Sequence, residues 1–296
     1  TRYNSVLLPH IKMSENILFS HQKDTIFNQF DPDLLIIATP VAYVRQTIRD
    51  FVPFIQKCSN LKTIVNLAKG LEQESLKRMS EVLKDELPTE FHSIIATLSG
   101  PSHAEEVAKK IPTTVVIAGS DPEAITYARN TISTPWFRAY SSYDIIGVEL
   151  GGTVKNIIAI AAGIIDGLGL GDNTKGALLT RGIAEIKRLG LAMNAEADTF
   201  SGLSGIGDLI TTAISLHSRN RYVGYELGKG RKTDEILKSM TMVAEGVFSA
   251  KAIWELKEKL HVEMPITDEV YKVLFENKSP KEALTDLMTR KLKDEV

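Results

Sequence analysis

The sequence has 296 residues, which suggests about two domains, and 43% hydrophobic with 24% charged residues excludes wholesale disorder. The 35 Lys and Arg residues nearly balance 37 Asp and Glu, and no basic run is present, so general nucleic-acid binding is not expected. The single cysteine, Cys58, excludes an internal disulfide and fits a reducing compartment.

The first half alternates short apolar runs with helical patterns. We expect strands at the runs and helices between them, which predicts an α/β domain with a mainly parallel sheet over residues 1–147. The expected strands are Leu34–Thr39, Thr63–Leu67, Ile94–Leu98 and Thr114–Ala118, and the expected helices are Val41–Cys58, Glu72–Asp85 and one opening at Asp121.

The second half shows helical periodicity and no convincing strand from Val148 onward. We expect an all-α domain over residues 148–296. Its clearest helix start is Ser279-Pro280-Lys281-Glu282, a capping box with proline at the first helical position. The longest apolar run, Ile157–Ile165, is well short of the roughly 20 residues that span a bilayer, so we expect no membrane segment.

Lys155 is the most informative residue for function. It lies in a stretch that is apolar on nearly every helical face, which predicts burial, as does the neighbouring amide of Asn156. Burial lowers the pKa of a lysine and suits it to act as a general base. The alternative is a lysine at a helix end whose stem carries its charge to solvent.

Three further groups are candidates for a ligand site. Lys69 follows an expected strand, at the sheet edge where α/β proteins bind ligands, although a solvated loop lysine is the simpler interpretation. Ser102 and Glu105 predict a capping box after a Gly-Pro turn, which is either an anion site or an ordinary cap. Asp208 and Thr212 are four apart, on one helix face, and precede Ser218-Arg219-Asn220, a combination suited to a phosphate group or to a polar loop. The histidines show no metal-ligand spacing, so no metal is assigned.

Together these motifs resemble a known family. The strings SGPSHAEE, ELGGTVKNIIAIAAG, NTKGALLTRGIAEIKRLG, TFSGLSGIGDLITT and SRNR, with KGLE, VAEG and MPIT in the same order, are similar to bacterial glycerol-3-phosphate dehydrogenase [NAD(P)+]. The resemblance covers essentially the whole chain. It implies a Rossmann-type sheet domain followed by an all-α substrate domain, NAD or NADP as cofactor, and interconversion of sn-glycerol 3-phosphate and dihydroxyacetone phosphate for phospholipid synthesis.

The resemblance also implies roles for particular residues. Lys155 is then the general base and a substrate contact. The resemblance implies a cytoplasmic enzyme. A homodimer is a further hypothesis, with its interface on the apolar all-α half. The other substrate-binding residues implied are Lys69, Gly100, Ser102, Asp208, Ser218, Arg219 and Asn220, and the cofactor-binding residues implied are Lys69, Ala104, Arg219, Val243 and Glu245.

Two departures from the family pattern stand out. The G-x-G-x-x-G loop and the first βα unit of the family are absent, and the sequence begins Thr1-Arg2 without Met, which predicts an N-terminally truncated chain with cofactor binding in doubt. His103 stands where the family usually has Phe.

Two alternatives remain open at this point. One is another two-domain dehydrogenase, of the hydroxyacid or phosphogluconate type, which substrate competition would distinguish. The other is a truncated relative that binds phosphate without redox activity, which a cofactor-binding measurement would distinguish.

Overall fold

The structure is a computed structural model that describes residues 2–4, 8–240, 242–292 and 294–295. The chain forms two compact units. The first, here the sheet unit, comprises Thr1–Ala68 and Met79–Ile145, and the second, the helical unit, comprises Lys69–Arg78 and Ile146–Val296. The chain therefore enters the helical unit twice, and a single domain boundary at residues 147/148 stays a prediction.

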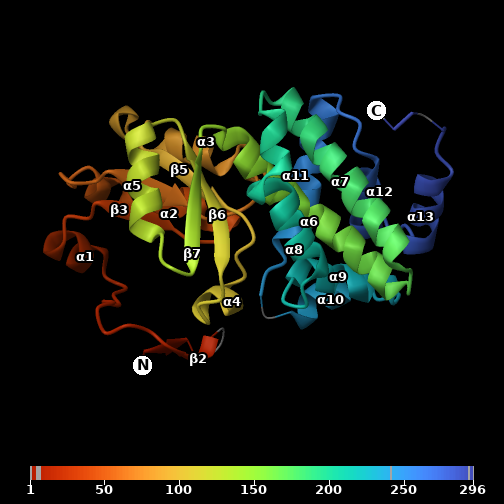
Figure 1. The fold of residues 1–296 in the computed structure, drawn as a ribbon, viewed down its shortest axis with the longest axis horizontal. Helices are drawn as coiled ribbons and strands as arrows, with labels where there is room; N and C mark the ends of the chain where they lie inside the picture. Colours follow the sequence, from red (N-terminus) through yellow and green to blue (C-terminus); the bar gives the residue numbers. More distant parts are fainter. Residues whose placement is uncertain (1, 5–7, 241, 293, 296) are drawn as a thin grey trace. The chain divides into compact units, whose positions relative to one another are not determined.

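The sheet unit is built on a five-stranded sheet with the order β3-β4-β5-β6-β7 (Figure 1). Neighbouring strands are parallel except for β5 and β6, so the prediction of a mainly parallel sheet is confirmed. The elements in chain order are β1 (Tyr3–Asn4), β2 (Leu8–Lys12), α1 (Lys23–Gln29), β3 (Leu34–Ile37), α2 (Val41–Ile55), β4 (Thr63–Asn66), α3 (Met79–Glu86), η1 (Thr89–Phe91), β5 (Ile95–Ser99), α4 (Ala104–Ala108), β6 (Thr113–Gly119), α5 (Pro122–Ile132) and β7 (Phe137–Ser142).

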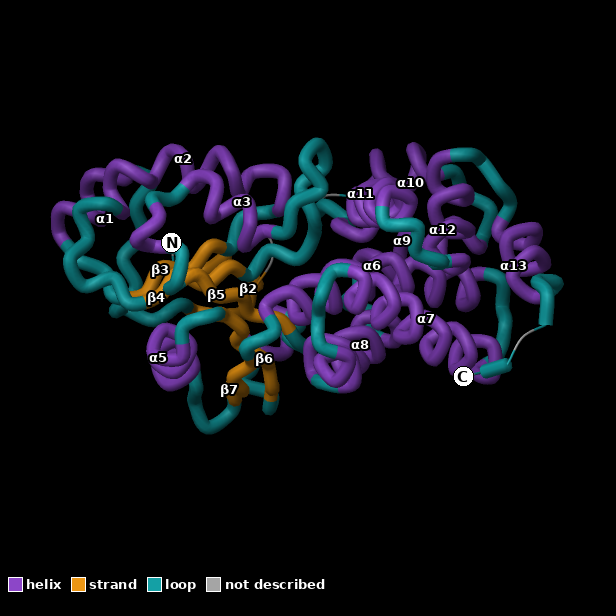
Figure 2. The backbone as a smooth tube through the Cα atoms, turned by 90° about the horizontal axis from the view of Figure 1, so that it is seen from above, coloured by secondary structure: helices purple, strands orange, loops and turns teal. Residues whose placement is uncertain are grey.

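Helices cover both faces of this sheet. Ile64 points to a core shared with α2 and α3, whereas the next residue, Val65, points to a core shared with α5. This alternation follows from the two-residue period of a strand, and both residues are buried because both faces are covered. Figure 2 shows α2 and α3 on one side of the strands and α5 on the other.

One expectation about the sheet unit is wrong, and several of its elements were not predicted. The helix expected from Glu72 begins only at Met79, because an isolated bridge pairs Leu71 with Arg78 and holds the intervening residues in a loop. Strand β7 was not expected, because its sequence, FRAYSS, is half polar and only Ala139 is buried. The hairpin of β1 and β2 and the short helix α1 also carried no sequence signal that we recognised.

The helical unit is all-α from Ile146 onward in the described residues, as predicted. Its central element is α6, in which nearly every residue is buried and whose apolar side chains contribute to the main core cluster of the unit. Its helices are α6 (Ile145–Gly167), α7 (Asp172–Ala192), η2 (Ala197–Ser201), the π-helical turn η3 (Leu203–Gly207), α8 (Asp208–Ile214), α9 (Arg219–Gly228), α10 (Thr233–Ser239), α11 (Glu245–Lys259), α12 (Pro265–Phe275) and α13 (Pro280–Met288).

Helix α6 corrects the expectation about membrane segments. It has 23 residues and is long and apolar enough to cross a bilayer, because the apolar pattern continues on both sides of Lys155. However, 89% of its apolar window is buried. A helix that is apolar all round and enclosed by other helices is the core of its domain.

The sequence predicts two capping boxes, and one of them forms, as does the simple N-cap predicted at Asp121 before α5. At α13, the Ser279 hydroxyl accepts from the amide of Glu282 at 3.1 Å, and the Glu282 carboxylate accepts from the amide of Ser279 at 3.2 Å. The capping box predicted for Ser102 is wrong. His103 precedes α4 as its N-cap residue, and the Ser102 hydroxyl donates to the carbonyl oxygen of Gly100 at 3.0 Å instead.

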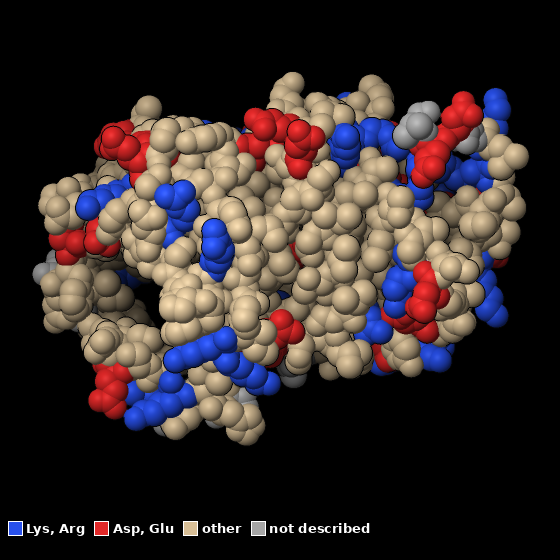
Figure 3. All heavy atoms as spheres, viewed as in Figure 1, with Lys and Arg blue, Asp and Glu red and all other residues tan. Residues whose placement is uncertain are grey.

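The surface charge agrees with the composition. Figure 3 shows basic and acidic side chains interspersed over much of the face in view, with a group of basic side chains gathered at its lower left edge.

Candidate active site

The site is centred on Lys155, in the middle of α6. Its side chain is 7% exposed, so the prediction of burial is confirmed, and the alternative of a helix-end lysine reaching solvent is wrong. Asp208 and Thr212 face it from successive turns of α8, as their spacing predicts. Helix α8 follows directly from the π-helical turn η3, and such turns are frequent at functional sites.

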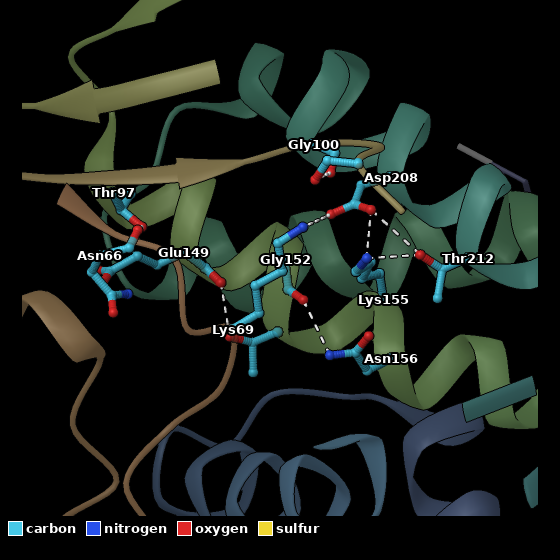
Figure 4. Close-up of polar contacts among 12 residues, drawn as sticks. Asn66, Lys69, Thr97, Gly100, Glu149, Gly152, Lys155, Asn156, Asp208 and Thr212 are labelled. Carbon is cyan, nitrogen blue, oxygen red and sulfur yellow. Dashed lines mark hydrogen bonds and ion pairs between the residues drawn. The ribbon is translucent and has the colours of Figure 1, made fainter. Parts of the chain in front are cut away.

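One carboxylate joins two ammonium groups (Figure 4). The Lys155 ammonium donates to Asp208 Oδ1, and it donates to Thr212 Oγ1 at 2.7 Å. The Lys69 ammonium donates to the other carboxylate oxygen, Asp208 Oδ2, at 2.7 Å. The structure thus brings together two lysines that are 86 residues apart in the sequence, and it makes Lys69 part of a built cluster rather than a solvated loop residue.

The electrostatics of this cluster lower the pKa of Lys155 toward the neutral range. Burial lowers the pKa of Lys155 to about 8, with a further lowering by the Lys69 charge, although Asp208 opposes both. Burial raises the pKa of Asp208, but the two lysines outweigh it and hold the pKa of that carboxyl below its usual range. Asp208 is therefore the fixed anion of the site, and Lys155 is the group that titrates near neutral pH.

A second polar cluster lies at the N-terminus of α9. Ser218 caps the helix, its hydroxyl accepting from the amide of Arg221 at 3.2 Å. The Arg219 guanidinium donates to the carbonyl oxygen of Val243 at 2.8 Å, and the buried Asn220 amide oxygen accepts from the amide of Gly246 at 2.9 Å. These two hydrogen bonds hold the start of α11 and the residue before it against Arg219 and Asn220, which are suited to bind a phosphate.

Gly246 links this cluster to the lysines. A Cβ atom at this position would lie 2.8 Å from the carbonyl oxygen of Asn156 and 2.8 Å from Asn220 Oδ1. Asn156 follows Lys155 directly in α6, so the cluster at α9 lies beside the turn that carries the buried lysine. Glycine is required at position 246 because a side chain there would push the α11 backbone away from the Asn156 carbonyl and the Asn220 amide.

Other predicted site residues belong to the sheet unit. Gly100 has a left-handed φ of 130°, and a Cβ atom there would lie 3.0 Å from the Cα of Val115. Ser102 follows it, and Ala104 opens α4. The structure does not bring these three residues together with Lys155 within one unit, so their roles stay predictions.

Two hydroxyl groups that sequence reasoning missed lie at the carboxyl edge of the parallel strands. Thr39 Oγ1 follows β3, and Ser99 Oγ ends β5; both atoms are buried without a hydrogen-bond partner in the described part of the chain. An unsatisfied buried hydroxyl needs an explanation, and a ligand at this edge supplies one. A hydroxyl residue at the carboxyl end of an expected strand, or directly after it, is the signal that would have found them.

Two other features carry no catalytic assignment. Among the described residues, no cluster of three or more His, Cys, Asp or Glu side chains could hold a metal ion. A cavity of about 750 Å³ lies among α6, α7, α12 and α13, but its lining includes none of the predicted site residues.

A mainly parallel sheet with unsatisfied hydroxyl groups at its carboxyl edge, followed by a helical unit with a buried lysine, fits the class of two-domain dinucleotide-dependent dehydrogenases. Family models refine this class. The model of the NAD-dependent glycerol-3-phosphate dehydrogenase N-terminus matches residues 1–125, and that of the C-terminus matches residues 144–285. The chain belongs to the NAD-dependent glycerol-3-phosphate dehydrogenase family.

Individual relatives agree with this assignment. The chain is 49% identical to glycerol-3-phosphate dehydrogenase [NAD(P)+] of Chlorobium phaeobacteroides, over 99% of this chain and 87% of the relative. It is 47% identical to the protein of that name from Fusobacterium nucleatum, over 100% and 86% of the two chains. The crystal structure of glycerol-3-phosphate dehydrogenase from Coxiella burnetii superimposes with a TM-score of 0.90 at 33% identity, covering 98% of this chain and 86% of that one.

The comparisons also bear on the hydroxyacid alternative. A D-mandelate dehydrogenase structure shares only 13% identity at a TM-score of 0.55, which shows a related fold alone. The main functional interpretation is therefore supported over the hydroxyacid alternative.

Proposed function

We propose that this chain interconverts sn-glycerol 3-phosphate and dihydroxyacetone phosphate with NAD or NADP, in the cytoplasm and in support of phospholipid synthesis. The observation that carries the proposal is the pair of lysines on one buried carboxylate, Lys155 and Lys69 on Asp208. A secondary alcohol loses a proton from oxygen and a hydride from carbon when it becomes a ketone. A buried amine beside a fixed cation supplies the proton acceptor and stabilises the oxygen that loses its proton.

Lys155 is the proposed general base. In oxidation its neutral amine takes the proton of the C2 hydroxyl, and Asp208 with Thr212 then holds the resulting ammonium by the contacts seen here. In reduction the same ammonium returns the proton to the carbonyl oxygen. Lys69 holds a second ammonium group on the same carboxylate and polarises the carbonyl.

The α9 cluster is the proposed phosphate site. Ser218, Arg219 and Asn220 supply a hydroxyl, a guanidinium and an amide, and a guanidinium matches two phosphate oxygens at once. Gly100 and Ser102 are proposed as further substrate contacts. Binding the phosphate beside the turn of Lys155 would place C2 of the substrate near the base. Such positioning speeds the reaction because the entropy of orienting the substrate is lost on binding and not in the chemical step.

The residues present fit a nicotinamide cofactor. When bound, NAD or NADP accepts the hydride in oxidation and donates it in reduction. The unsatisfied hydroxyls of Thr39 and Ser99 mark the sheet edge where dinucleotides bind in this fold class. The proposed cofactor contacts are Lys69, Ala104, Arg219, Val243 and Glu245.

A homodimer is proposed as the oligomeric state. Support comes from apolar residues spaced four apart along η3 and α8, Ile206, Ile210 and Ile214, which are 40%, 41% and 55% exposed. Exposed apolar stripes of this kind are typical of protein interfaces. Sedimentation equilibrium would show twice the chain mass, and a monomer at all concentrations would contradict the proposal.

The deciding experiment follows NADH and NADPH oxidation with purified protein and dihydroxyacetone phosphate. We expect oxidation of the cofactor that depends on this substrate. It should be weak with 2-keto acids such as pyruvate, which are the oxidised forms of hydroxy acids. Oxidation driven better by the carboxylated compounds would favour the hydroxyacid class. No oxidation by folded protein that still binds glycerol 3-phosphate would favour a phosphate-binding relative without redox activity.

A further inference from the structure

Lys69 reaches Asp208 from a loop, and the position of its ammonium depends on how that loop is held. Residues Lys69–Arg78, here the lysine loop, connect β4 to α3 in the sequence but belong to the helical unit. The Lys69 side chain is 22% exposed, so packing alone does not hold its ammonium at Asp208. The position of the loop backbone must therefore be set by its other residues.

Apolar contacts hold the body of the loop. Leu71 and Leu76 are 1% and 6% exposed, within the core cluster of the helical unit. The backbone bridge between Leu71 and Arg78 closes the loop, and Leu76 turns it with a left-handed φ of 58°. That conformation is uncommon for a leucine, which indicates that burial of its side chain determines the turn.

The far end of the loop is held by a buried ion pair. The Arg78 guanidinium donates to Glu149 Oε2 at 2.8 Å, and the two side chains are only 10% and 5% exposed. A buried ion pair contributes little net stability compared with apolar residues of the same volume, but it specifies one geometry. Glu149 lies six residues before Lys155 in α6, so one helix carries both the proposed base and the anchor of the loop.

We propose that Arg78 and Glu149 are positioning residues that fix the lysine loop along α6, so that the Lys69 ammonium is held at Asp208. The two residues act through Lys69 and not on the substrate. The inference rests on the proposed function, because Lys69 is the residue through which their effect reaches turnover. A displacement of about 1 Å at a reacting group can cost about 100-fold in rate, which makes such an anchor measurable.

The test is a double-mutant cycle between the anchor and the lysine. Glu149→Gln keeps the size of the side chain and removes its charge. We expect kcat/KM for dihydroxyacetone phosphate to fall by roughly 10-fold, as for a partial misplacement of Lys69. In a Lys69→Ala background, the same change should alter kcat/KM by less than about 2-fold, because nothing remains to be positioned.

Two further measurements separate positioning from a general loss of structure. Asp268→Asn is the control. It removes the charge of a carboxylate whose Oδ1 lies 2.6 Å from Nζ of the buried Lys257, in the same unit but away from the site, and it should leave kcat/KM unchanged. Hydrogen exchange at the amides of residues 70–77 should become faster in Glu149→Gln and stay unchanged in Asp268→Asn. If Glu149→Gln does not fold, Arg78→Lys, which keeps the charge and loses the planar fork, replaces it in the same cycle.

The outcomes are distinct. Wild-type activity in Glu149→Gln, or an equal fold-loss with and without Lys69, would overturn the positioning role. Unchanged exchange in the lysine loop would overturn it as well. Inactive wild-type protein would instead count against the proposed function, and the exchange measurement would then still decide whether Glu149 anchors the loop.

Discussion

At the scale of single residues, Asp208 organises the chemistry. It is 2% exposed and accepts from two ammonium groups that would otherwise repel each other in a buried site. The carboxylate compensates about one positive charge, and the remaining excess, together with burial, keeps the pKa of Lys155 near 8. A lysine with its pKa at that value exchanges protons readily in either direction of a reversible reaction.

The first prediction removes the proposed base. Lys155→Ala should lower kcat by at least about 100-fold, the usual contribution of general acid–base catalysis, with a smaller change in KM. Steady-state kinetics with dihydroxyacetone phosphate would measure both. Lys175→Ala is the matched control, because Lys175 is also ion-paired in the helical unit, with Asp166, and lies outside the site. Near wild-type turnover without Lys155 would refute its role.

The second prediction concerns pH. Oxidation needs the neutral amine, so kcat/KM for glycerol 3-phosphate should rise with pH through about 8 and then level off. Reduction needs the ammonium, so kcat/KM for dihydroxyacetone phosphate should fall through the same pH. Initial rates in both directions across pH 6–10 would test this, and two limbs that do not mirror each other would assign the titration to another group.

At the scale of elements, the contact between α6 and α9 places the two polar clusters. The helices meet backbone to backbone, since a Cβ atom at Gly224 would lie 1.9 Å from the carbonyl oxygen of Ile160. At that separation the N-terminus of α9, with Arg219, stays beside the turn of α6 that carries Lys155. Small residues allow such close helix packing because no side chain intervenes.

The third prediction tests this contact. Gly224→Ala should destabilise the protein by about 1–3 kcal/mol or more, because the methyl group must push the two helices apart. It should also raise KM for the phosphate substrate. Gly176→Ala is the control, since a Cβ atom in that part of α7 meets nothing within 4 Å, and it should be neutral or slightly stabilising. Urea unfolding would compare the two, and equal stabilities would argue against a tight crossing.

At the scale of the whole molecule, the two units have separate cores, and the helical unit contains a buried acid of its own. The Glu185 carboxylate of α7 accepts from the amide of Thr267 at 3.2 Å and from its hydroxyl at 3.1 Å, and from the amide of Ile266 at 2.6 Å. These contacts cap the N-terminus of α12 from another helix. Burial nevertheless raises the pKa of Glu185 to about 7, because it outweighs the hydrogen bonds.

The fourth prediction follows from this shift. The folded protein holds the proton between the ordinary value of 4.5 and about 7, whereas the unfolded chain does not. The contribution of Glu185 to stability is therefore complete below pH 4.5 and is lost as the pH rises through about 7. The loss amounts to about 3 kcal/mol.

Glu185→Gln should abolish this part of the pH dependence. Trp254 is a local reporter, because its ring stacks on Tyr271 of α12 with centroids 4.2 Å apart. Its fluorescence during urea unfolding, in a Trp136→Phe background, would give the stability at each pH. A stability difference between the variant and its parent that stays constant from pH 4 to 8 would contradict the prediction.

Sequence alone determined the class of fold and the central catalytic candidate. Continuous apolar runs closed by turns predicted β3 to β6, because parallel strands are buried on both faces and need no alternation. Lys155 was identifiable because a charge within an otherwise apolar helix is costly unless it is used. The motifs also predicted the family, since several strings occur in the same order along the chain.

Only the tertiary structure decided which distant residues meet. Periodicity reports the burial of a face but not its neighbour, so the residue pattern joined neither Lys69 to Asp208 nor Arg78 to Glu149. The family resemblance implied one substrate site for Lys69 and Asp208, but not the contact between them. The helix expected from Glu72 failed for the same reason: a bridge between Leu71 and Arg78 and two buried leucines outweigh local helix propensity. Long-range pairing is decided by packing between elements, and it is this pairing that brings two lysines to one carboxylate.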